Sequence, residues 1–299
     1  MSILRAPIRA AAAALVLAGG VAIPSGAWAD SAETLLYERT LMDRAGARCH
    51  LFSPDIAAAL SAAGTQARGA VLRGGGSAAG VRQIEDRAAL KAYAVPCASP
   101  DLATAATRVR RAFDGYADLR FMRFPGSFSP WQAERKPWPL VVKGKVQPGP
   151  RWRLTQTAQS DAGVVTFGMA DGPELVVVTT AGDAGRAAGA RLLLRDPAKA
   201  ADPFLDPRRP GLLGRVPPRA LTQAFLARSL GPAPASLSLG GGTELRFSAD
   251  AAQALAMLDP REAATVELVF PTRTGERVET AIIEVGDFAA ARAFLAVGR

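Results

Sequence analysis

The chain has 299 residues, of which 49% are hydrophobic and 21% are charged, and its formal net charge is +9. This hydrophobic content excludes an intrinsically disordered protein and is sufficient for one large domain or two smaller ones. The positive charge would attract an anionic lipid or polysaccharide, although a solvated basic surface is the simpler explanation. No feature indicates a nucleic-acid partner.

Residues 1–29 have the pattern of a secretory signal peptide. Arg5 and Arg9 supply its positive start, and the apolar run 10–23 follows. The Ala-Trp-Ala sequence at 27–29 then matches the small-x-small pattern of a cleavage site. The apolar run is shorter than the ~20 residues that a membrane span needs. We therefore expect a periplasmic or secreted protein that does not span a membrane.

Residues 30–124 are predicted to form a helical unit. Ser-Pro-Asp occurs at 53–55 and again at 99–101. In each case serine is a good cap, proline suits the first turn, and aspartate favours the positive end of the helix dipole, so both sequences predict helix starts. Leu102, Val109 and Phe113 recur at helical spacing and predict an amphipathic helix that continues to about Tyr116.

The two cysteines, Cys49 and Cys97, each lie shortly before a predicted helix start. In an exported protein such a pair is most simply a disulfide, which would add about 4 kcal/mol of stability through loop-closure entropy. A redox pair is the first alternative, because a helix start lowers a thiol pKa, but no Cys-x-x-Cys is present. The second is a zinc site that includes His50, for which no fourth ligand is evident.

Residues 125–150 are rich in proline and are predicted to form a linker or strap without regular structure. Three tryptophans occur in or next to this segment, and basic residues lie between them. Aromatic rings beside cations suit sugars, lipid headgroups or stacked bases. The alternative is that the rings fix the strap to a domain core. The predicted ligand-binding residues are Trp131, Trp138, Trp152, Arg135 and Lys136.

Residues 151–299 are predicted to form a mostly antiparallel β unit with short helices, so that the whole chain has an α+β fold. A helix is expected from Pro217-Pro218 to about Leu230. Further helices are expected after Ser248 and after Asp287, and a hairpin turn at 272–275. The strands are expected at 151–158, 163–168, 174–180, 190–195, 243–247, 264–270 and 276–285.

No motif indicates catalysis, a cofactor or a metal site. His50 is the only histidine, so a Ser-His-Asp triad would have to use it, and a two-histidine metal site lacks its second ligand. No nucleophile motif accompanies His50. Asp196, Asp202 and Asp206 each precede proline, a pattern typical of turns, although three carboxylates on one loop could also bind calcium. The sequence thus favours a non-catalytic binding or envelope-accessory protein. The alternatives are a glycan hydrolase that uses two carboxylates and a scaffold subunit whose β-edge pairs with another envelope protein.

Overall fold

The computed structural model describes residues 25–136, 140–142, 145–147, 150–160, 163–179, 187–234, 237 and 242–297. Nearly all of the predicted signal segment lies outside this range. The backbone is helical from Ser25, so the expected cleavage site at 27–29 falls within the first turns of the first helix.

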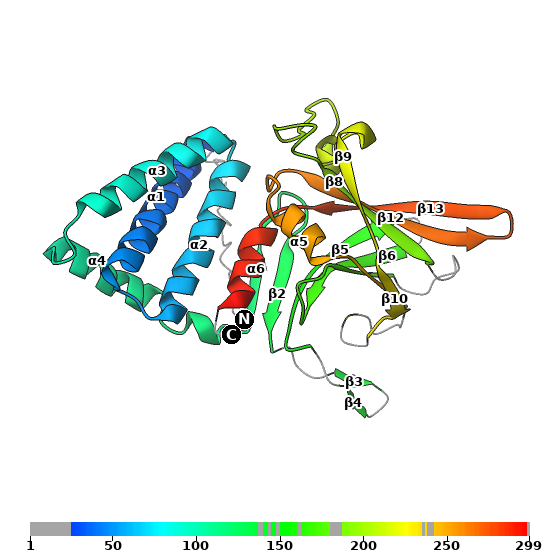
Figure 1. Cartoon of the computed structure of the whole chain (residues 1–299), viewed down its shortest axis with the longest axis horizontal. Coiled ribbons are helices and arrows are strands. Elements are labelled where there is room, and N and C mark those ends of the chain that lie inside the picture. The colour runs from blue at the N-terminus through cyan, green and yellow to red at the C-terminus, as the bar shows by residue number, and fades with distance from the viewer. Residues whose placement is uncertain are drawn as a thin grey trace, which may run out of the picture.

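The chain has the α+β fold expected from the sequence, with a helical unit followed by antiparallel sheets (Figure 1). α2 and α4 begin at Pro54 and Pro100, as the two Ser-Pro-Asp sequences predict. Neither preceding serine makes a side-chain capping bond, so proline and the aspartate charge account for these starts. The helices of the unit are α1 (Ser25–Cys49), α2 (Pro54–Arg73), α3 (Ala78–Ala94) and α4 (Pro100–Ala112).

A disulfide joins Cys49 and Cys97 with their Cα atoms 5.5 Å apart, which confirms the predicted pairing. Cys49 is the last residue of α1, and Cys97 lies between α3 and α4. Because the two sulfurs are bonded to each other, neither is a thiolate that could ligate zinc. His50 beside the bridge is exposed and has a positive φ of 54°.

The β unit contains a seven-stranded and a four-stranded sheet, both antiparallel, and a separate two-stranded hairpin. The seven-stranded sheet has the order β1-β2-β5-β6-β7-β11-β10, and the four-stranded sheet has the order β13-β12-β8-β9. The strands of these three sheets are β1 (Phe121–Phe124), β2 (Trp131–Arg135), β3 (Leu140–Val142), β4 (Lys145–Gln147), β5 (Trp152–Ser160), β6 (Gly163–Ala170), β7 (Val176–Thr179), β8 (Gly189–Arg195), β9 (Thr222–Leu226), β10 (Ser229–Pro232), β11 (Thr243–Arg246), β12 (Ala263–Thr272) and β13 (Gly275–Glu284).

One continuous apolar core lies between the two sheets and the helices α5 (Ala249–Ala256) and α6 (Phe288–Ala296). Trp131 and Phe288 stack in this core with ring centroids 4.8 Å apart. α6 also contacts α2, so this last helix joins the helical unit to the seven-stranded sheet, as its place between α2 and β2 in Figure 1 shows.

Several segments differ from the sequence expectation. β1 lies within residues 30–124, which the sequence predicts to be helical, and both β3 and β4 lie within the predicted strap, 125–150. β2 also lies inside the segment expected to be an irregular strap. It forms a strand because buried side chains alternate with more exposed ones along it. The prolines of the segment flank this strand and do not interrupt it. The helix expected over 217–230 is wrong. There a short 3-10 helix, η3 (Arg219–Leu221), leads into β9 and β10. Pairing of β9 with the otherwise open edge of β8, Leu192 opposite Phe225, overrides the local helical preference.

Candidate functional site

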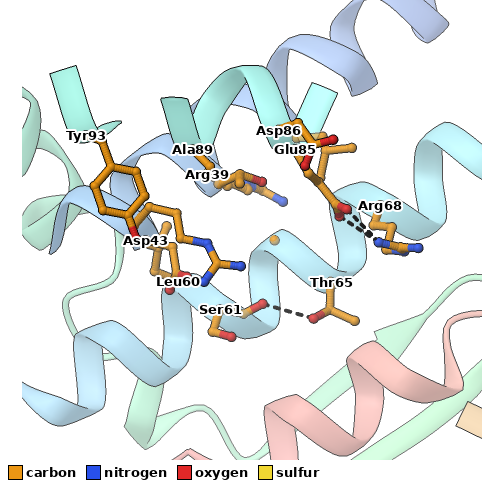
Figure 2. Close-up of a pocket in the computed structure, with 14 residues that line it drawn as sticks. Arg39, Asp43, Leu60, Ser61, Thr65, Arg68, Glu85, Asp86, Ala89 and Tyr93 are labelled. Carbon is orange, nitrogen blue, oxygen red and sulfur yellow. Dashed lines mark hydrogen bonds and ion pairs between the residues drawn. The ribbon is translucent and has the colours of Figure 1, made fainter. Parts of the chain in front are cut away.

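A groove lies between α2 and α3, with α1 as its floor (Figure 2). α1 packs closely on both neighbours, whereas α2 and α3 touch each other little. The resulting cavity of about 480 Å³ is in the range of small-molecule sites. Its lining residues are Leu36, Arg39, Thr40, Asp43 and Arg44 from α1; Leu60, Ser61, Gly64, Thr65 and Arg68 from α2; and Glu85, Asp86, Ala89 and Tyr93 from α3.

The helices leave this groove open because their apolar contacts gather at its two ends. Leu36 belongs to one buried cluster, and Leu60 belongs to a second cluster that reaches α4. Between these clusters α2 presents Gly64 and α3 presents Ala89, which are too small to bridge the gap. A Cβ atom built on Gly64 would meet no atom within 4 Å, so this position faces open space.

The two ends of the groove differ in their polar contacts (Figure 2). At one end Arg68 Nη1 donates to both carboxylate oxygens of Glu85, at 2.7 and 2.8 Å, and so ties α2 to α3. At the floor Arg39 Nη1 donates to the carbonyl oxygen of Ala63 at 2.7 Å. These bonds hold both guanidinium groups in place beside the cavity.

Asp43 is a half-buried carboxylate that lines the groove. Burial raises its pKa above the ordinary value of 3.8, and the neighbouring charge of Arg44 opposes that rise. It makes no hydrogen bond or ion pair with any other residue that the structure describes. In Figure 2 it lies at the end of the groove opposite the Arg68–Glu85 bridge, together with Tyr93.

The groove as a whole is charge-balanced. Its lining holds three arginines and three carboxylates, in contrast to the formal charge of +9 over the chain. Its hydroxyl groups have no histidine beside them, because the chain's single histidine, His50, does not line the cavity. A cavity lined by charges of both signs suits the binding of a polar molecule.

The predicted ligand-binding residues occupy different surroundings. Trp131 is 0% exposed, and its indole Nε1 donates to the carbonyl oxygen of Val285 at 2.9 Å. Trp152 is also buried in the sheet core. Both positions match the alternative that the rings fix this segment to the core. Trp138 lies outside the described residues.

Arg135 is a buried structural residue. Its guanidinium donates to the carbonyl oxygens of Tyr116 and Ala117, each at 2.9 Å, and lies 3.7 Å from the ring centroid of Phe294. It therefore joins the end of the helical unit to α6. Lys136, which follows it, is exposed and has a φ of 48°. Ligand binding by Lys136 and Trp138 remains a prediction.

The aspartate–proline sequences form turns. Asp196 Oδ1 accepts the amide hydrogen of Ala198, and Asp206 Oδ1 accepts that of Arg208, each at 3.0 Å. These bonds are the local interactions that make Asp-Pro a turn signal. Within the described ranges, no three histidine, cysteine or acidic side chains come together as a metal site would require.

Sequence reasoning did not identify the groove residues. Charged side chains on amphipathic helices resemble an ordinary solvated face, and only the mid-helix Gly64 departs from that pattern. In the part of the chain that the structure describes, no helix is both long and apolar enough to cross a membrane. Comparisons with models of protein families, with curated proteins and with solved structures find no match to this chain.

Proposed function

We propose that this chain is a non-catalytic binding protein of the bacterial periplasm, and that the groove between α2 and α3 takes a small zwitterionic molecule. The observation that carries the proposal is the half-buried, unpaired carboxylate of Asp43 in a charge-balanced cavity. The secretory pattern of residues 1–29 and the disulfide Cys49–Cys97 support the compartment.

A zwitterion is complementary to the groove, whose lining carries both positive and negative charges. An ammonium group of the ligand would pair with Asp43 and offset the cost of its burial. An acidic group of the ligand would accept from the remaining donors of Arg39 and from Arg44, which lie on the same helix. The charge of +9 over the chain would bring anionic envelope material close without selecting among ligands.

Two kinds of envelope molecule share this chemistry: a phosphoethanolamine lipid headgroup and a short peptide with free termini. Calorimetric titration with O-phosphoethanolamine and with dialanine would distinguish them. Dextran sulfate serves as a purely anionic probe. Binding of one zwitterion and not of dextran sulfate in the groove is the expected result; binding of neither zwitterion would refute the proposal.

Replacing Asp43 by asparagine tests the ammonium contact. Asp43→Asn should weaken binding about tenfold or more, since a charge-assisted bond is lost. The exposed Asp114, which follows α4 and lies outside the groove, provides the matched control Asp114→Asn. Unchanged affinity in Asp43→Asn would remove Asp43 from the site.

The pH dependence follows from the raised pKa of Asp43. A carboxyl whose pKa is raised in the folded state destabilises the fold once it is ionised, so Asp43→Asn should melt at a higher temperature than the parent at pH 7. This difference should vanish below the unfolded value of 3.8, where both states of the parent are protonated. Zwitterion binding by the parent should fall as Asp43 gains its proton. A lower melting temperature for Asp43→Asn at pH 7 would contradict this assignment.

Gly64 offers an independent way to block the groove. Because a Cβ atom at this position meets open space and Gly64 lines the cavity, Gly64→Phe should place its ring in the cavity. We expect binding to be lost and the helical circular dichroism signal to be kept.

A further inference from the structure

β13 is the edge strand of the four-stranded sheet. β12 pairs with one of its sides along its whole length, and among the described strands none pairs with the other. The third strand, β8, reaches only as far as Val269 of β12, so the end of the hairpin extends beyond the sheet. Figure 1 shows this hairpin reaching far from the helical unit. An unpaired edge of this kind is a template for pairing with another strand.

The exposed part of this edge carries charges of alternating sign. Arg277 is exposed and lies opposite Phe270 of β12, and Glu279 lies opposite Leu268, so both charges are on the core face of the sheet. Val278 between them is 44% exposed on the other face. Arg277 Nη2 and Glu279 Oε1 are 3.1 Å apart within the chain.

Glu279 is incompletely satisfied. Its side chain is 6% exposed, and its Oε2 atom is buried without a hydrogen-bond partner among the described residues. A buried carboxylate oxygen without a donor destabilises a fold, and a second cation at this edge would relieve that cost. The Oε2 atom of Glu279 could therefore accept a hydrogen bond from a further cation.

We propose that the partner is the β13 strand of a second copy of this chain, paired antiparallel about Val278. In that register Arg277 of each copy lies opposite Glu279 of the other, and the two Val278 side chains face each other. Two cross-strand ion pairs form and each Glu279 gains a second arginine.

The charge pattern selects this register over its neighbours. Facing residues of an antiparallel pair point to the same side of the sheet, so a continuous sheet allows only shifts that keep both core faces together. Moving the centre of symmetry to Arg277 places two arginines opposite each other, and moving it to Glu279 places two glutamates opposite each other. Both arrangements are repulsive.

A cavity of about 760 Å³ adjoins β13 and is lined by Thr280 and Ile282 together with Ala158, Val164 and Leu213. In the proposed register the turn of the second copy approaches this end of the strand. A short edge contact fits a weak dimer, with a Kd between about 10 μM and 1 mM.

Sedimentation velocity of charge-reversed variants tests the pairing. Arg277→Glu and Glu279→Arg should each weaken self-association about tenfold or more, because each places like charges opposite one another. A mixture of the two variants should form a one-to-one heterodimer, since every facing pair is then of opposite charge. Arg108→Glu, the same reversal at an exposed position of α4 in the helical unit, is the control. A parent chain that stays monomeric up to about 1 mM, or single variants that still dimerise, would overturn the proposal.

A cross-link gives a readout that does not depend on the folding of Glu279→Arg. Val278 would face its own copy, so Val278→Cys should form a disulfide-linked dimer under mild oxidation. Thr280→Cys should not, because Thr280 would face Glu276. Equal cross-linking of both variants would indicate random collision and refute the register.

Discussion

The helical unit and the β unit bury their apolar side chains in different ways. The β unit holds one continuous core with large aromatic residues, such as Trp131, Phe167 and Phe288. Around α1 the helical unit holds two small clusters, whose buried members are aliphatic side chains and Met42, at separate positions along that helix. The disulfide Cys49–Cys97 joins the end of α1 to the connection between α3 and α4.

This difference shows how each unit combines stability with an accessible site. A continuous aromatic core needs no cross-link, but it leaves little room inside. Two small clusters joined by a disulfide can leave a polar groove between them, because covalent closure replaces part of the missing apolar burial. The unit with less buried apolar surface is therefore the one that carries the candidate site.

Truncation of Trp131 should give the largest effect. Trp131→Ala removes a fully buried ring and leaves the carbonyl oxygen of Val285 without its donor, so we expect a loss of about 3–5 kcal/mol of unfolding free energy. Chemical denaturation would measure it, with Lys136→Ala as the exposed neighbouring control. A loss of less than about 1 kcal/mol would mean that the core of the β unit does not depend on this ring.

Removal of the disulfide should affect the helical unit selectively. Cys49→Ser with Cys97→Ser should cost about 4 kcal/mol by loop-closure entropy. Hydrogen exchange should then accelerate in α1 to α4 while the amides of β5, β6 and β12 keep their protection. Equal loss of protection in both units would contradict the contrast between them.

Two glycines of α2 should respond in opposite directions to alanine. At Gly69 a Cβ atom would collide with Oδ1 of Asp287, a buried carboxylate held by Arg73, so Gly69→Ala should cost about 1–3 kcal/mol. At Gly64 a Cβ atom meets nothing, and Gly64→Ala should stabilise the helix by about 0.5–1 kcal/mol. Thermal denaturation of the two variants would measure both changes in stability. Stabilisation by both would mean that α2 does not press against Asp287.

Local patterns in the sequence were sufficient to predict most of the architecture. Proline and aspartate after serine predicted the starts of α2 and α4, and the strand predicted at 163–168 lies within β6. The predictions were wrong at positions where tertiary contacts determine the local structure or burial. β9 is a strand because β8 offers it a partner, and Trp131 is buried because α6 returns to cover β2.

The groove could not be predicted in the same way. Arg39 and Asp43 are spaced as in any solvated helix face, and only the separation of α2 from α3 brings them to one cavity. That separation depends on how α2 and α3 pack on α1. No local sequence pattern predicts this packing. A glycine in the middle of α2, at position 64, was the one local indication.

The position of α6 has a consequence for the order in which the chain is assembled. During synthesis α1 to α4 leave the ribosome before any strand, yet Ala59 and Ala62 of α2 pack against the end of α6, which follows every strand. The face of α2 that contacts α6 therefore stays uncovered until α6 has packed on the sheet. The two units can therefore join only after α6 has been made.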